Sequence, residues 1–174
     1  MHLIGPGGAG KSTTAPLLAE ALELSCIDLD REYLRTAQID KDVDEKGYKY
    51  YVRRNIDLYL ELTSGLNDTV IATSSGFMTY ANQIHLAIPP IQQEILASSL
   101  TVLLLPSFDV KICTKKTINR LLSRPYESKS VSFQRQTIEE RFLIYRPMGN
   151  VQVTTNLKVE EVVSEIQTVL AATE

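Results

Sequence analysis

Short apolar runs alternate with longer stretches of helical periodicity along this chain. Runs rich in apolar and β-branched residues, typical of strands, lie at residues 2–4, 24–27, 69–73, 100–105 and 151–155. Apolar residues recur at helical spacing over residues 12–22, 50–62, 91–97, 110–122, 133–145 and 159–170. Strands that alternate with helices predict an α/β fold whose central parallel sheet is covered by helices on both faces, which is a three-layer αβα architecture.

Two polar segments interrupt this alternation. Residues 123–133, with the sequence SRPYESKSVSF, carry Ser and Pro without periodicity, so we expect a mobile loop between two helices there. Residues 40–49 are a second polar segment. With 174 residues the chain is long enough to bury one core, and we expect a single domain over residues 1–174.

Composition and charge argue against several classes of protein. The apolar fraction of 44% and the charged fraction of 22% are ordinary for a globular domain. A net charge of -3 is unlike that of a general nucleic-acid binder, and no apolar run approaches the roughly 18 residues of a membrane span. Cys26 and Cys113 lack the C-x-x-C spacing of metal sites and disulfide frameworks. We therefore expect a cytoplasmic monomer without a leader peptide that binds neither nucleic acid nor membrane.

Positive charge is concentrated in one part of the chain. Residues 111–146 hold nine of the 18 Lys and Arg residues and three acidic residues. Such a patch suits a phosphorylated or carboxylated small molecule. From charge alone, a solvated helix face is an equal alternative.

A glycine-rich segment directly follows the first predicted strand. Residues 5–12, GPGGAGKS, match the pattern G-x-x-x-x-G-K-[ST]. The glycines let the backbone curl with its N–H groups pointing inward, and the following helix adds the positive end of its dipole. Lys11 would reach the terminal phosphates and Ser12 would ligate Mg²⁺. A chance match to a glycine-rich turn is the alternative, but the strand before the motif and the helix after it favour a nucleoside triphosphate site.

Two acidic residues follow the second predicted strand. Asp28 and Asp30 are two residues apart, so on an extended chain their side chains point to the same side. Because the loops after parallel strands gather at one edge of a sheet, we expect both carboxylates beside the phosphate loop. One carboxylate would help to hold Mg²⁺ through water, and the other would orient or deprotonate an acceptor hydroxyl. A solubilising acidic turn is the alternative.

These motifs resemble those of the shikimate kinases, the small P-loop kinases of aromatic amino-acid biosynthesis, and the resemblance spans almost the whole chain. The family's G-x-x-G-x-G-K-S-T loop is matched by Gly5, Gly8 and residues 10–13, and its D-x-D by Asp28 and Asp30. The resemblance implies that Asp28 serves the Mg²⁺ site. It also implies that Asp30 holds hydroxyls of the substrate and acts as a candidate base.

The resemblance further implies a P-loop kinase fold with ATP as co-substrate and Mg²⁺ as cofactor. A mobile lid is expected over about residues 121–137 and a substrate-binding helical segment over about residues 31–63. The expected nucleotide-binding residues of the phosphate loop are Gly8, Ala9, Gly10, Lys11, Ser12 and Thr13.

The family's F-R-x-x-E helix, whose Arg grips the substrate carboxylate, is matched imperfectly by the sequence YYVRRNID. An alignment that has no gap before the next family motif matches Arg53 to the family's Arg, and Ile56 then stands in place of the Glu. Arg54 would place Asp57 at the acidic position at the cost of a one-residue gap. We take Arg53 as the expected substrate ligand.

The family's triple-glycine loop after the third strand is replaced here by Ser74, Ser75 and Gly76. In the family this loop lets the sugar-like ring approach the backbone, and Gly76 keeps its last glycine as an expected substrate contact. Two added side chains narrow such a pocket or add hydroxyls to it.

Three arginines complete the resemblance. Arg124, followed by Pro125, matches the first half of the family's R-P-L-L lid motif, and Arg120 is expected to flank the nucleotide. Arg141 and Tyr145 match the carboxylate-binding R-x-P-L-Y motif, with another residue in place of its Pro. The resemblance implies that Arg124 stabilises charge on the transferring phosphoryl group and that Arg141 binds the substrate carboxylate. Without the family pattern, solvated helix surface is the alternative for each.

We therefore predict a kinase that moves the γ-phosphoryl group of ATP to a hydroxyl of a small carboxylated polyol, with shikimate as the first candidate. The expected catalytic residues are Lys11, Asp30 and Arg124. Two alternatives stay open. One is a kinase of the same build that acts on another acceptor, such as a sugar acid, and the other is a nucleotide-binding or regulatory protein without transfer activity.

Overall fold

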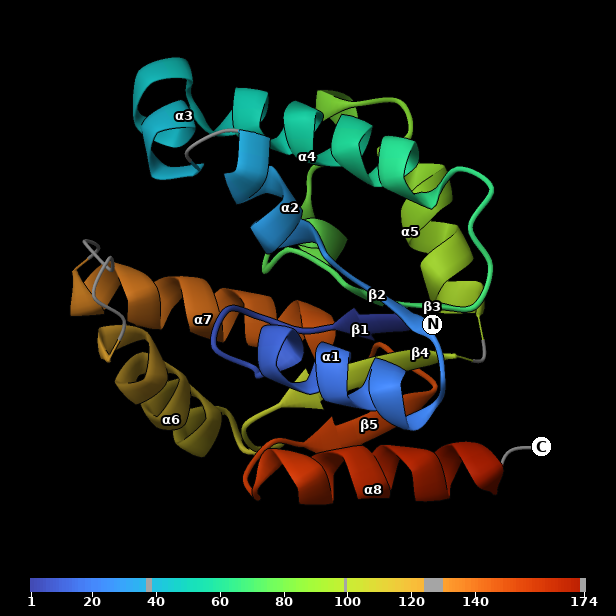
Figure 1. Ribbon diagram of the computed structural model, residues 1–174. Coiled ribbons are helices and arrows are strands. Elements are labelled where there is room, and N and C mark those ends of the chain that lie inside the picture. Colours follow the sequence, from blue (N-terminus) through green and yellow to red (C-terminus); the bar gives the residue numbers. More distant parts are fainter. Residues whose placement is uncertain (37–38, 99, 124–129, 173–174) are drawn as a thin grey trace.

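A computed structural model describes residues 1–36, 39–98, 100–123 and 130–172 (Figure 1). In chain order the described elements are β1 (His2–Ile4), α1 (Lys11–Ala21), β2 (Ser25–Asp28), α2 (Leu29–Thr36), α3 (Ile39–Lys46), α4 (Tyr48–Thr63), β3 (Thr69–Ala72), the 3-10 turns η1 (Phe77–Thr79) and η2 (Asn82–Ile84), α5 (Ile88–Ala97), β4 (Thr101–Leu105), α6 (Val110–Leu122), α7 (Val131–Tyr145), β5 (Val151–Thr154) and α8 (Val159–Ala171).

The five strands form one parallel sheet in the order β2-β3-β1-β4-β5. Helices α1 and α8 cover one face, and α4, α5 and α7 cover the other (Figure 1). The predicted three-layer αβα architecture is confirmed. Because all strands run in the same direction, the loops after β1, β2 and β3 leave from the same edge of the sheet.

Two apolar clusters, one on each face of the sheet, hold the layers together. On β1, Leu3 belongs to the cluster with α1 and α8, whereas the next residue, Ile4, belongs to the cluster with α4, α5 and α7. Val102 and Leu103 on β4 alternate in the same way. All four side chains are fully buried, and burial of each contributes roughly 1.5–3 kcal/mol to folding. This explains why the strands of a parallel sheet read as continuous apolar runs.

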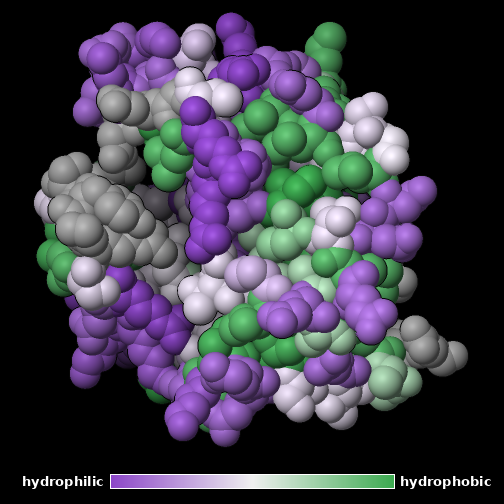
Figure 2. Space-filling view, viewed as in Figure 1, coloured by the Kyte–Doolittle hydropathy of each residue, from purple (hydrophilic) through white to green (hydrophobic). Residues whose placement is uncertain are grey.

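Two helices, α2 and α3, lie where the apolar periodicity predicts none. Figure 2 shows hydrophilic side chains gathered over both of them. On α2 only Leu29 and Tyr33 are buried, so the helix carries a narrow apolar stripe. Helix α3 occupies most of the polar segment over residues 40–49.

The position of α2 corrects one expectation about the acidic pair. The prediction that Asp28 and Asp30 point to the same side of an extended chain is wrong, because β2 ends at Asp28 and Asp30 is the second residue of α2. Their side chains therefore follow no strand alternation. Both residues still lie at the carboxyl edge of the sheet, as expected.

The expected mobile loop between α6 and α7 also needs a correction. Helix α7 begins at Val131, and the Ser130 hydroxyl accepts a hydrogen bond from the Phe133 backbone N–H at 3.3 Å, as an N-cap does. The loop over residues 123–133 is therefore shorter at its carboxyl end than expected. Residues 124–129 lie outside the described residues, so the lid stays a prediction. In the described part of the chain, no helix combines the length and the apolarity that crossing a membrane would need.

The chain passes very close to β4 where it leaves β1. At Gly5, φ is +144°, and a Cβ there would lie 2.4 Å from the Leu104 carbonyl oxygen. Only glycine fits this position, because such a contact is too short for any side chain. Gly65 also has a positive φ of +74°, but no atom lies within 4 Å of a Cβ built there.

These two glycines give a test of the packing at the start of the phosphate loop. Gly65→Ala should cost about 1 kcal/mol of the free energy of unfolding, from backbone strain alone. Gly5→Ala should cost about 3 kcal/mol or more, because β1 and β4 must also move apart. Equilibrium urea unfolding measures both values. Equal losses would show that the loop relaxes without disturbing the sheet.

Candidate active site

Residues 5–10 form a loop between β1 and α1 whose centre is occupied by a lysine. Gly10, with φ 101°, precedes α1 and provides no side-chain cap, so the positive end of this helix faces the loop. Lys11 is buried, and its Nζ donates hydrogen bonds to the carbonyl oxygens of Gly5 at 2.6 Å and Pro6 at 3.1 Å. The ammonium group therefore lies across the loop, where backbone carbonyls hold it.

A cavity of about 340 Å³ opens beside this loop. Its lining includes Gly8, Gly10, Thr13, Arg120 and Thr155. The Arg120 guanidinium donates to the Gly8 carbonyl at 3.0 Å and to the Thr155 hydroxyl at 2.9 Å. Burial lowers the pKa of Arg120 from its usual high value. The structure thus brings Arg120 to the phosphate loop, next to this cavity.

Asp28 ends β2 and caps the helix that follows. One carboxylate oxygen, Oδ1, accepts hydrogen bonds from the backbone N–H groups of Asp30 at 3.1 Å and Arg31 at 3.2 Å. The other, Oδ2, is buried without a hydrogen-bond partner and lies 3.8 Å from Nε of Arg31. A buried carboxylate oxygen of this kind fits a bound cation. Within the described ranges, no group of three or more His, Cys, Asp and Glu residues gathers to hold a metal ion.

The charge of Asp30, in the first turn of α2, acts on a group of buried tyrosines. Burial raises the pKa of Tyr51, Tyr80 and Tyr145 above the usual value of a phenol, and the nearby Asp30 carboxylate adds to each rise. These phenols therefore keep their protons at neutral pH. They come from α4, from the segment after η1 and from α7, and all lie on the sheet face that carries α4.

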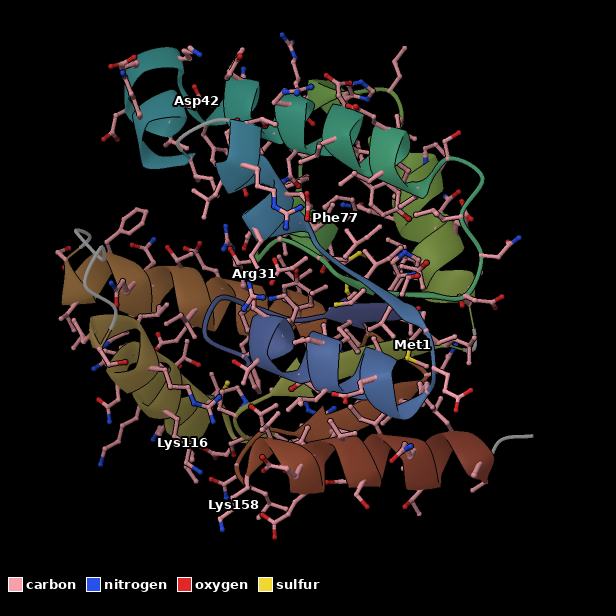
Figure 3. The ribbon with its side chains drawn as sticks, viewed as in Figure 1. Met1, Arg31, Asp42, Phe77, Lys116 and Lys158 are labelled. Atoms are coloured by element: carbon pink, nitrogen blue, oxygen red, sulfur yellow. The ribbon has the colours of Figure 1, made fainter. Side chains whose placement is uncertain are left out.

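The loop after β3 brings together Gly76 and Arg141, two of the expected substrate-binding residues. Nη1 of Arg141 donates to the Ser75 hydroxyl at 3.2 Å, and a Cβ built on Gly76 would lie 3.0 Å from Nη2. The Tyr145 hydroxyl donates to the Ser75 carbonyl at 3.2 Å. Nearby Phe77, labelled in Figure 3, lies beneath α4. Arg141 and Tyr145 of α7 thus fix the loop that replaces the triple glycine.

Tyr48 is a member of this group that the sequence analysis did not select. Its hydroxyl would lie 3.1 Å from a Cβ built on Gly76, and the same Cβ would lie 3.0 Å from Nη2 of Arg141. Burial raises the pKa of Tyr48, and the charge of Arg141 opposes that rise. Its spacing of three residues before Tyr51 is a helical signal that could have found it.

Arg53 lies apart from these residues. Its Nε donates to the Ile84 carbonyl at 3.0 Å, and its side chain is exposed. Asn55, two residues later, is fully buried and donates to the Ser74 hydroxyl at 2.9 Å. Two residues correspond to about 200° around a helix, so Arg53 leaves α4 on the side opposite to Asn55. A role for Arg53 in substrate binding stays a prediction that this arrangement does not support.

Arg54 and Arg124 are the two other arginines that the family pattern singles out. Arg54 is half-buried, and its positive charge acts on Tyr33 of α2. Arg124 lies outside the described residues, and its expected role at the phosphoryl group stays a prediction.

The chain is similar to known proteins in both sequence and fold. A family model described as shikimate kinase matches residues 7–171. The shikimate kinase of Francisella philomiragia is 31% identical over 175 residues, covering 98% of this chain and 93% of the relative. A solved structure of a shikimate kinase from Acinetobacter baumannii in complex with shikimate aligns with a TM-score of 0.77 at 22% identity, covering 99% of this chain and 93% of that chain. A gluconokinase from Sinorhizobium meliloti 1021 aligns with a TM-score of 0.56 at 19% identity, covering 98% and 90%.

Substitution of Asp28 separates its capping role from its charge. Asp28→Ala removes the oxygen that accepts from the start of α2, and we expect it to lower the free energy of unfolding by about 1 kcal/mol. Asp28→Asn keeps an accepting amide oxygen and should cost less. Equilibrium urea unfolding without nucleotide or metal measures both variants. Equal losses would show that the hydrogen bonds to Asp28 do not stabilise the start of α2.

Proposed function

This chain belongs to the shikimate kinase family, and we propose that it transfers the γ-phosphoryl group of ATP to a hydroxyl of a small carboxylated polyol, with shikimate as the first candidate. The observation that carries the proposal is a close contact between two loops. A Cβ built on Gly7 of the phosphate loop would lie 3.6 Å from Cβ of Ser75, whose hydroxyl accepts from Arg141. An acid bound by Arg141 would therefore lie next to a phosphate held by the loop.

On the nucleotide side, the phosphates of ATP would replace the loop carbonyls as partners of Lys11. The ammonium is already buried in the loop, so it needs little reorganisation to stabilise charge that develops during transfer. Mg²⁺, when bound, neutralises charge on the phosphate oxygens. The Ser12 hydroxyl and Oδ2 of Asp28 are the groups that would hold it, and the missing hydrogen bond at Oδ2 supports this assignment.

On the acceptor side, Asp30 would accept the proton of the attacking hydroxyl or orient it. Arg141 would bind the acceptor carboxylate, and the phenol of Tyr48 would add a second contact beside Gly76. Arg124, proposed from its sequence motif, would close on the transferring phosphoryl group. Phosphoryl transfer is mostly positioning and electrostatic stabilisation, so these groups suffice without a covalent intermediate.

A second candidate acceptor is a sugar acid. Ser74 and Ser75 put side chains where the family pattern has glycine, and the side of α4 that faces this loop carries Tyr51 and Asn55 rather than an arginine. These features change the shape and hydrogen bonding of the acceptor site while leaving the phosphate loop intact. They support a different acceptor for the same phosphoryl transfer.

The test of the proposed function is a coupled ADP-release assay with ATP and Mg²⁺. Its four arms contain shikimate, quinate, gluconate or no acceptor. We expect shikimate to stimulate release above the arm without acceptor. Stimulation by gluconate alone would favour the sugar-acid kinase. No stimulation by any acid, with ATP still bound, would overturn the proposal in favour of a nucleotide-binding protein without transfer activity.

Two arginines provide a test of where the carboxylate binds. Arg141→Ala should raise the KM for the acceptor by about 10-fold or more, because a hydrogen bond to a charged group contributes roughly 1.5–3 kcal/mol. Arg53→Ala loses a hydrogen bond to a backbone carbonyl on the other side of α4, and the acceptor KM should stay within about twofold of its original value. Steady-state kinetics at saturating ATP measure both. A larger increase in the acceptor KM for Arg53→Ala than for Arg141→Ala would show that Arg53 binds the carboxylate, as the sequence motif predicts.

A further inference from the structure

Ser75 lies where two parts of the candidate site meet. Its hydroxyl accepts a hydrogen bond from Nη1 of Arg141 at 3.2 Å. A Cβ built on Gly7 of the phosphate loop would lie 3.6 Å from Cβ of Ser75 and 4.0 Å from its hydroxyl oxygen. The Ser75 side chain is half-buried, whereas that of Ser74 is fully buried. Ser75 therefore places a partly exposed hydroxyl between the arginine of α7 and the phosphate loop.

Hydrogen bonds on both sides of this hydroxyl hold the backbone of the loop in place. The Ser75 carbonyl accepts from the Tyr145 hydroxyl at 3.2 Å. One residue earlier, the Ser74 hydroxyl accepts from the buried Asn55 amide at 2.9 Å. Buried polar groups are costly unless they are hydrogen-bonded, so these contacts fix the loop before any ligand binds. A side chain that is positioned in advance loses little conformational freedom when it contacts a ligand.

The Ser75 hydroxyl still has its own proton to donate. A serine oxygen can accept a hydrogen bond while its proton is donated to another group, and here the accepted bond comes from Arg141. Within the part of the chain that the structure describes, no protein group accepts the Ser75 proton. A hydroxyl that accepts from a charged donor is polarised, which strengthens the bond that it donates. The proton is therefore available to an oxygen of a molecule bound beside the guanidinium.

We infer that Ser75 is a substrate-binding residue of this chain, whose hydroxyl accepts from Arg141 and donates to the acceptor carboxylate that Arg141 binds. The inference rests on the proposed function, because it needs an acid bound at Arg141. It concerns a side chain that the family pattern lacks, since glycine stands at this position in the triple-glycine loop. The acceptor carboxylate would then lie against α7 and the loop after β3, beside Gly7 of the phosphate loop.

Ser75→Ala is the direct test, because it removes the hydroxyl and keeps the Cβ that lies beside Gly7. The acceptor is the acid that stimulates ADP release in the assay above. We expect its KM to rise about 10-fold, as for loss of one hydrogen bond to a charged group. The KM for ATP and kcat should stay within about twofold, because the lost bond contributes equally before and during transfer.

Ser75→Gly separates the hydroxyl from the bulk of the side chain. This variant has the residue of the family pattern and loses the same hydroxyl, so the acceptor KM should rise as much as in Ser75→Ala. An acceptor KM in Ser75→Gly at or below that of the original protein would show that the serine side chain obstructs the acceptor. That result would overturn the inference.

The matched control is Thr79→Val, which removes a hydroxyl just after the same loop and leaves the contact of Ser75 with Arg141 in place. The Thr79 hydroxyl donates to the Gly76 carbonyl at 2.9 Å, and that carbonyl also accepts from the Thr79 backbone N–H at 2.8 Å. Because the carbonyl keeps this second bond, the acceptor KM should stay within about twofold of its original value. Thermal unfolding of each variant without ligand shows whether a change in KM follows a loss of stability.

A double-mutant cycle tests whether Ser75 and Arg141 act on the same group. If both bind one carboxylate, the effects of Ser75→Ala and Arg141→Ala on the acceptor KM should not add in the double variant. Fully additive effects would overturn the assignment of both residues to one carboxylate.

The outcomes for Ser75 and for the proposed function are distinct. An increase in acceptor KM in Ser75→Ala and Ser75→Gly, but not in Thr79→Val, supports the inference. Kinetics of Ser75→Ala equal to those of Thr79→Val, in an enzyme that phosphorylates an acid, would overturn the inference and leave the proposed function standing. Equal increases in the KM values for ATP and acceptor would also overturn it, as a general loss of structure. A protein that transfers to none of the acids would overturn both.

Discussion

The central place of β1 in the sheet, paired on one side with β3 and on the other with β4, is the constraint on which the candidate active site depends. Parallel pairing sets Leu3 beside Ala72 and Val102, so the chains after β1 and β3 leave the sheet at the same level. The phosphate loop and the loop of Ser74 to Gly76 then have to meet, and Gly7 and Ser75 do so. Strand pairing thus brings the two loops together, and α2, α4 and α7 contribute side chains around their contact.

Features that depend on local sequence could be predicted. Strands β3 and β4 are continuous buried runs because both faces of the sheet are covered there, and the phosphate loop is specified by glycines within eight residues of one another. Helix α2 could not be read from an apolar pattern, since only Leu29 and Tyr33 are buried on it. Its start depends on Asp28, which ends a strand and caps a helix at the same time. A pattern of alternating side chains cannot represent a residue that does both.

The face of α4 was harder to predict, for a geometric reason. A shift of one residue in the alignment of a motif turns a side chain by about 100° around a helix, so counting from a neighbouring loop does not fix which residue faces the site. Burial fixes it. Tyr51 and Asn55, four residues apart, share the buried side of α4, and Asn55 reaches Ser74. Arg53 is consequently turned away, although it has the residue type that the motif requires. The partner of Asn55 is 19 positions along the chain, where local sequence carries no information about it.

The buried, uncharged network of Asn55, Ser74 and Tyr80 supports the loop after β3 and would affect which acceptor the site selects. A buried ion pair costs desolvation energy that its attraction repays only with excellent geometry, whereas Asn55, Ser74 and Tyr80 are uncharged and are joined by hydrogen bonds through Asn55. Arg141 would then determine that the acceptor is an acid, while the loop of Ser74 to Gly76 would determine the shape of the acceptor site. The two serines in place of glycine would thereby act on selectivity without changing the groups proposed to transfer phosphate.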